Sequence, residues 1–136
     1  MYRASLLIIS AVGEAGIGLL LLVWPSAPIA LLIGVEQASL ETIFVTRVAR
    51  AALLGIGVAC WPARNDRGSL AQLGLLTGLL IYDVAAAALL AYAGCVLGMV
   101  GVALWPAVVA HVMLAVWCVL CLFLATQAVR KEQHAT

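Results

Sequence analysis

Four long apolar stretches divide the chain, and short polar or proline-containing segments separate them. The stretches cover about residues 6–24, 40–61, 70–92 and 102–127. Each is close to or above the roughly 20 apolar residues that a helix needs to cross a bilayer. They are continuous rather than alternating, which is typical of spanning helices. The pattern predicts an all-α, integral membrane antiparallel four-helix bundle that forms a single domain over residues 1–136.

Local signals mark the ends of these predicted helices. Tryptophan-proline pairs stand at residues 24–25, 61–62 and 105–106. Tryptophan favours the headgroup level and proline suits a helix end or first turn, so we use the pairs as depth marks. Ser39 is a predicted N-cap for the second span. The apolar run Ile29–Val35 is too short to cross and predicts an interfacial or re-entrant piece.

Composition places the chain in the membrane. Of its 136 residues, 66% are hydrophobic and only 10% are charged, whereas a soluble domain has about 25% charged residues. The lipid bilayer is therefore the first expected partner. The net charge of +1 gives no basic patch for phosphates, so no nucleic acid is expected.

The basic residues outside the spans predict the orientation. Under the four-span model they all fall on one side: Arg3, Arg64, Arg67, Arg130 and Lys131. The opposite side carries Glu36 and Glu41. By the positive-inside rule both termini are cytoplasmic, in a multi-pass protein of the bacterial inner (cytoplasmic) membrane. The first span carries Glu14 and lacks a good cleavage site after it, so we expect it to be retained.

Every predicted span carries at least one ionisable residue in its interior, and together these are Glu14, Arg47, Arg50, Asp83 and His111. At 1.5 Å per residue, Glu14 and Arg50 lie roughly 15 Å from the nearest depth mark, near the midplane. Asp83 and His111 fall in the outer half, and Arg47 lies one turn outward of Arg50. A charge in hydrocarbon costs at least about 2.5 kcal/mol. We therefore predict that Glu14 pairs with Arg50 and that Asp83 pairs with Arg47.

These shared depths predict an outward-facing polar site that binds a small anionic or amphiphilic ligand, for transport or sensing. The side chains expected to line it are Glu14, Arg47, Arg50, Tyr82, Asp83 and His111. The arginines would hold the anion, and His111 is the group that changes charge near neutral pH. The alternative hypothesis is a non-catalytic accessory subunit of a larger membrane complex, or a homo-oligomer, in which the charges are only interhelical ties.

Other motifs add less. Cys118-Val-Leu-Cys121 resembles a redox pair, but its apolar neighbours favour helix packing. A small residue one turn before His111 is similar to the chlorophyll sites of light-harvesting polypeptides, so tetrapyrrole binding through His111 is a lesser alternative. Gly74 and Gly78 have the small-x-x-x-small spacing and are predicted to pack inside the bundle, with a dimer interface as the alternative. The sequence has no nucleophile triad, metal cluster or nucleotide fingerprint, so it predicts no enzyme, metal or cofactor.

As a whole, the chain resembles small bacterial four-helix inner-membrane proteins of the DoxX-like kind. The resemblance rests on Arg50-Ala-Ala-Leu-Leu-Gly-Ile-Gly within a span, on the four-span length and on the tryptophan-proline ends. It implies a four-helix fold and a membrane location.

Overall fold

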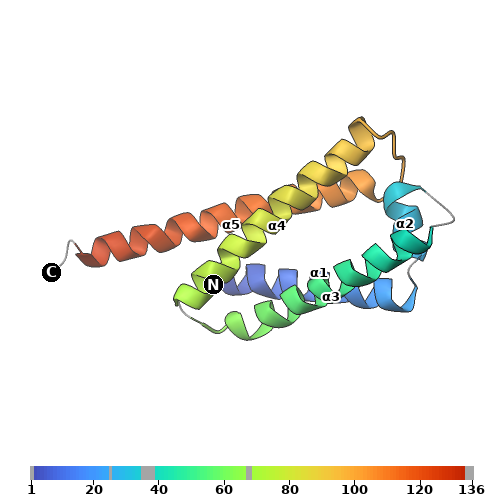
Figure 1. Ribbon diagram of the computed structural model, residues 1–136. Coiled ribbons are helices and arrows are strands. Elements are labelled where there is room, and N and C mark those ends of the chain that lie inside the picture. Colours follow the sequence, from blue (N-terminus) through green and yellow to red (C-terminus); the bar gives the residue numbers. More distant parts are fainter. Residues whose placement is uncertain (1, 25, 35–38, 67–68, 134–136) are drawn as a thin grey trace.

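The computed structural model describes residues 2–24, 26–34, 39–66 and 69–133, all in helices and short connections (Figure 1). The helices are α1 (Tyr2–Val23), α2 (Ser26–Ile33), α3 (Leu40–Ala63), α4 (Leu70–Cys95) and α5 (Leu104–Gln133). All except the eight-residue α2 are long and apolar enough to cross a membrane. The predicted all-α fold, with helices long and apolar enough to span a membrane, is confirmed.

The helix ends follow local chemistry. The Ser39 hydroxyl accepts from the backbone N–H of Thr42 at 3.3 Å and thereby caps α3, as predicted. Ser69 caps α4 in the same way, through the N–H of Gln72 at 3.1 Å. α3 continues through Pro62 to Ala63, two residues beyond the approximate end of the second span at Trp61. Pro62 lacks only a donor, and its carbonyl still accepts from the following turn.

The long helices form two pairs, α1 with α3 and α4 with α5, and the helices of each pair run in opposite directions (Figure 1). Glycines set the register of the first pair. A Cβ added to Gly57 would lie 3.0 Å from the backbone nitrogen of Ala15, and one added to Gly18 would lie 2.9 Å from Cγ of Leu54. A residue one turn later in α1 therefore lies level with a residue one turn earlier in α3.

All four long helices meet in one apolar layer, which we call the cysteine core. Its buried members are Leu6, Leu7, Ala11, Cys60, Leu76, Leu79, Cys118 and Cys121. Cys118 and Cys121 are free thiols with side chains 0% and 1% exposed. Their small size lets α5 approach the other helices closely, so this C-x-x-C pair serves packing.

At the opposite end of the molecule, α2 fastens onto the α4–α5 connection. The Ala103 N–H donates to the Leu31 carbonyl at 2.9 Å. Gly101 is buried, and a Cβ there would lie 2.2 Å from the carbonyl carbon of Leu32, so only glycine fits. The predicted short apolar piece is thus a helix as far as Ile33, and Val35 lies outside the described residues.

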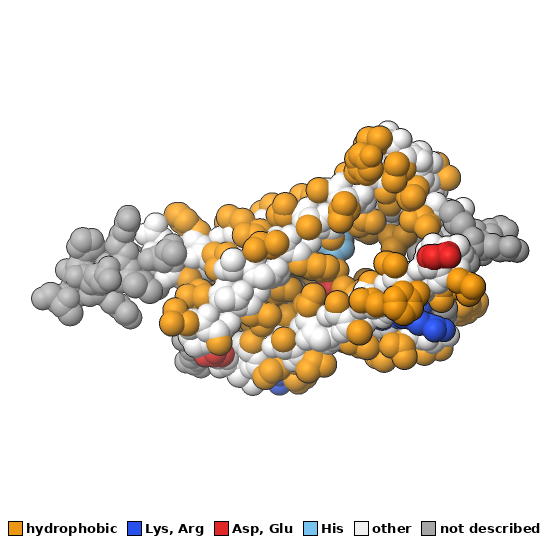
Figure 2. Space-filling view, viewed as in Figure 1, with side chains coloured by type: hydrophobic (Ala, Val, Ile, Leu, Met, Phe, Trp, Pro, Cys, Tyr) orange, Lys and Arg blue, Asp and Glu red, His pale blue; other side chains and the backbone are white. Residues whose placement is uncertain are grey.

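Apolar side chains cover most of the visible surface (Figure 2), as expected for helices that face lipid. One packing prediction was wrong. Gly74 and Gly78 are exposed, and nothing lies within 4 Å of a Cβ added to either. The buried face of α4 is formed instead by Gln72, Leu76, Leu79, Asp83 and Ala87. Gly74 follows Gln72 and Gly78 follows Leu76 by two residues, a step that places both glycines on the opposite side of the helix.

Candidate functional site

A polar cluster lies next to the cysteine core, on the side toward α2. Asp83 of α4 is 1% exposed, and its Oδ1 lies 2.8 Å from Nδ1 of His111 on α5. Asp83 follows Leu79 by one turn, and His111 precedes Cys118 by two, so both side chains belong to the inner faces that form the core. The contact joins the two helices of the second pair and fixes the orientation of the imidazole ring.

Tyr82 and Glu14 extend this cluster to the first pair. The Tyr82 hydroxyl donates to Oε2 of Glu14 at 3.3 Å, which links α4 to α1. The Tyr82 ring also meets the His111 ring edge-on, with centroids 5.6 Å apart and planes at 84°. Glu14 is 6% exposed and lies within electrostatic reach of His111 and Asp83. Four of the predicted site residues thus come together from three helices, and we call them the Glu14–His111 cluster: Glu14, Tyr82, Asp83 and His111.

Arg50 of α3 is buried but stands apart from this cluster. Its side chain is 4% exposed, and its Nε and Nη2 atoms have no hydrogen-bond partner among the described residues. Gly57 packs against Ala11 and Ala15 and so marks the level of Glu14. Arg50 precedes Gly57 by seven residues in α3, so it lies roughly 10 Å nearer the start of that helix. Burying a guanidinium without an opposite charge costs several kcal/mol of free energy, so an anion bound at these nitrogens would stabilise the protein.

The predicted salt bridges are therefore corrected. Among the described side chains, the structure forms neither the Glu14–Arg50 nor the Asp83–Arg47 pair: Glu14 accepts from Tyr82, and Asp83 contacts His111. The reason is the register. Gly18 faces Leu54, so Trp24 lies at the level of Val48, and only roughly 20 Å along the helix axis separates that level from Trp61. The prediction had assumed that Trp24 and Trp61 lie a full bilayer core apart, and this assumption placed Glu14 and Arg50 at the same level.

The predicted position of Arg47 was wrong for the same reason. It lies level with Trp24, at the end of the first pair, and its side chain is exposed. It shares a helix face with Arg50 but sits one turn further out. The structure therefore does not bring Arg47 together with the other predicted site residues.

Sequence reasoning missed two buried polar residues. Ser10 is 3% exposed and its hydroxyl has no partner among the described residues. Gln72 is 2% exposed, and its side-chain amide donates to the carbonyls of Ala63 and Asp66 at 2.9 and 2.6 Å. Gln72 was detectable, because it starts the series of three- and four-residue steps that ends with Asp83 and Ala87.

The arrangement limits the chemistry of the site. His111 uses Nδ1 toward Asp83, so Nε2 is the nitrogen left for a ligand or a tetrapyrrole metal. Within the described part of the chain, no group of three or more His, Cys, Asp or Glu side chains is placed to hold a metal ion. The surface is hollowed between the two helix pairs, where a histidine side chain is visible (Figure 2).

Neither a family model nor a curated protein nor a solved structure matches the chain. What the fold and the hydropathy support is a multi-pass membrane helical protein with a few buried charged residues. The DoxX-like resemblance stays an expectation from the sequence.

Proposed function

We propose that this protein binds a small anionic or amphiphilic ligand between its two helix pairs, for transport or sensing. In this proposal it is a DoxX-like protein of the bacterial inner membrane with both termini in the cytoplasm. The cysteine core then lies in the cytoplasmic half of the bilayer. The Glu14–His111 cluster and Arg50 lie further outward.

The buried guanidinium of Arg50 is the observation that carries the proposal. Two of its nitrogens are enclosed without an acceptor among the described residues. Hydrogen bonds to charged groups are worth about 1.5–3 kcal/mol, and leaving such a donor unpaired inside protein costs more than that. A carboxylate or phosphate from outside the chain satisfies both nitrogens at once, because the guanidinium fork matches either anion in a bidentate geometry.

The Glu14–His111 cluster supplies the second part of the site. Tyr82 and Asp83 are neighbours on α4, and their contacts to Glu14 and His111 tie α4 to both α1 and α5. The cluster lies one to two turns inward of Arg50, so an amphiphile held at Arg50 extends over this polar wall or along the adjacent apolar helix faces.

Titration with octanoate tests the proposal, since octanoate is an amphiphilic carboxylate. Thermal unfolding in a non-ionic detergent is followed with sodium octanoate or with sodium chloride of equal ionic strength. Octanoate is expected to raise the midpoint for the natural chain more than chloride does. Arg50→Gln should weaken this effect about tenfold or more in octanoate concentration, the equivalent of one charged hydrogen bond. Arg47→Gln is the matched control and should behave like the natural chain.

Two results would count against ligand binding. One is an octanoate response that Arg50→Gln and Arg47→Gln share. The other is no octanoate response at all, together with membrane proteins that copurify with the natural chain in mild detergent. The second result favours the accessory-subunit hypothesis, in which the buried charges only hold helices together.

A further inference from the structure

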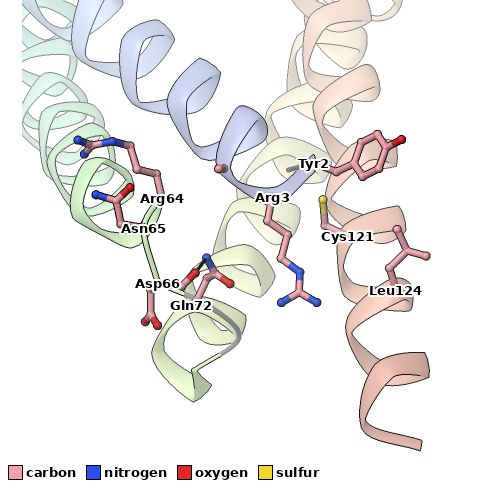
Figure 3. Close-up of a pocket in the computed structure, with 9 residues that line it drawn as sticks. Tyr2, Arg3, Arg64, Asn65, Asp66, Gln72, Cys121 and Leu124 are labelled. Atoms are coloured by element: carbon pink, nitrogen blue, oxygen red, sulfur yellow. Dashed lines mark hydrogen bonds between the residues drawn. The ribbon is translucent and has the colours of Figure 1, made fainter. Parts of the chain in front are cut away.

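A separate cavity of about 790 Å³ lies at the other end of the molecule, where α1 begins, α3 ends and α4 begins (Figure 3). Its volume falls in the range of about 300–1,000 Å³ that is typical of small-ligand sites. The residues that give it chemistry are Arg3, Arg64, Asp66, Gln72 and Cys121, and Tyr2 and Leu124 add apolar surface. Arg3 and Glu14 are eleven residues apart on α1, roughly 16 Å, so this cavity is distinct from the polar site above.

The polar wall formed by the α3–α4 connection is held in place by its own bonds. The buried Gln72 amide donates to the Ala63 and Asp66 carbonyls. The Arg64 guanidinium donates to the Trp61 carbonyl and stacks over the Trp61 ring at 3.9 Å. These contacts fix the loop and turn the Arg64 guanidinium away from Arg3, as Figure 3 shows.

Arg3 is the cation that remains for a ligand. Its guanidinium points into the space between Gln72 and α5 (Figure 3). Within the described ranges, it forms no hydrogen bond or ion pair with another side chain. Buried Cys121 and half-exposed Leu124 of α5 line the same cavity as Arg3. The cavity therefore joins one free guanidinium to an apolar helix face.

We propose that this cavity holds the phosphate headgroup of an anionic phospholipid, with Arg3 as its ligand and the acyl chains along α5. Three helix ends meet around the cavity, which places it at headgroup level in a spanning bundle. Tyr2 is 71% and Leu124 52% exposed, and both offer apolar surface to acyl chains. Anionic lipids attract arginines at this level by about 1 kcal/mol per residue. The cavity also encloses the headgroup, which general attraction to the membrane surface does not.

Native mass spectrometry with defined lipids tests this site. The full chain is released from nanodiscs that contain equal amounts of phosphatidylglycerol and phosphatidylcholine, and retained lipid is counted. The natural chain should retain phosphatidylglycerol in preference, and Arg3→Gln should lower that preference about fivefold, the loss of one arginine contact. Arg47→Gln, which removes the same charge at the opposite end, should leave the preference unchanged.

A second variant separates a built site from general surface attraction. Ala4 lines the cavity, and Ala4→Phe fills part of it without changing any charge. The proposal requires that Ala4→Phe also lowers the phosphatidylglycerol preference. It is overturned if Ala4→Phe retains this lipid as the natural chain does, or if Arg3→Gln does. Glycerol 3-phosphate is tested as a soluble competitor. If it binds as tightly as phosphatidylglycerol, the ligand is a soluble phosphate and the lipid proposal is wrong.

Discussion

The cysteine core and the Glu14–His111 cluster are adjacent layers of the same bundle, and they hold the helices together by different means. The core uses small and branched apolar side chains from all four long helices, with side chains such as Leu76 and Cys118 at 0% exposure. The cluster uses a few directed contacts, such as the 2.8 Å contact between Asp83 and His111, and the helix pairs diverge beyond it. Close packing therefore ends where the buried charges begin. Beyond them, Nε and Nη2 of Arg50 have no hydrogen-bond partner among the described residues.

In lipid, apolar side chains gain little from leaving the solvent, so close packing and polar contacts must do the work of association. The comparison predicts that loss of a core side chain weakens the whole bundle, whereas loss of a cluster contact weakens one helix pairing.

Leu76→Ala tests the cysteine core. Leu76 is 0% exposed, and its truncation leaves a cavity between the helices. We expect a loss of about 3 kcal/mol in the free energy of unfolding, as for other buried leucines. Denaturant titration in mixed micelles measures the change. Leu89→Ala on the same helix is the control, since Leu89 is 69% exposed. Equal losses in the two variants would contradict the packing described here.

Gly101→Ala tests the fastening of α2 to the α4–α5 connection. The new Cβ would lie 2.2 Å from the Leu32 carbonyl carbon, so the backbone must shift. We expect a loss of about 2–3 kcal/mol, because backbone cannot move aside as a flexible side chain does. Gly55→Ala is the control, since nothing lies within 4 Å of its Cβ. Hydrogen exchange at the Ala103 amide should rise in Gly101→Ala, and an unchanged rate would show that this contact does not hold the end closed.

Asp83→Leu tests the contact between α4 and α5. It leaves Nδ1 of His111 without a partner inside the bundle, and we expect a loss of about 2 kcal/mol. Asp83→Asn keeps an oxygen that accepts from Nδ1–H and should recover most of this loss. Unfolding of both variants, with and without His111→Leu, gives the coupling energy. A coupling energy near zero would mean that the Asp83–His111 contact contributes nothing to stability.

Tyr82→Phe tests the link between α4 and α1. It removes the hydroxyl that donates to Glu14 at 3.3 Å. Interhelical hydrogen bonds in membrane proteins average about 0.6 kcal/mol, and we expect a loss of that size. Tyr92→Phe serves as the control because Tyr92 is 52% exposed. A loss above that of Asp83→Leu would reverse the ranking of the two contacts.

The sequence predicted which charged residues are buried far better than the levels at which they lie and the partners that they contact. Hydropathy located the long helices, and the rarity of charge in them singled out Glu14, Asp83 and Arg50, all of which are buried. The pairing of those charges failed because it depends on helix register. Register is set by close contacts such as Gly57 on Ala15, which no hydropathy pattern reveals.

Arg47 and Arg50 illustrate the limit most clearly. They are one turn apart on the same face of α3, yet Arg50 is 4% exposed and Arg47 is exposed. Helical periodicity makes them equivalent. What separates them is where the helix pairs diverge, a property of the assembled bundle. On α4, by contrast, the spacing contained the answer: the steps from Gln72 through Leu76 and Leu79 to Asp83 mark the inner face, and the prediction from the glycine spacing overlooked them.

Solid-state NMR on the protein in lipid tests the central claim, that Arg50 takes its anion from outside the chain. The measurement is the dipolar coupling between ¹⁵N-labelled arginine side chains and octanoate labelled with ¹³C at the carboxyl carbon. We predict a coupling that corresponds to about 4 Å, as in a bidentate guanidinium–carboxylate pair. It should be present in the natural chain and in Arg47→Gln and absent in Arg50→Gln. A coupling that persists in Arg50→Gln, or none in the natural chain at saturating octanoate, would contradict the account.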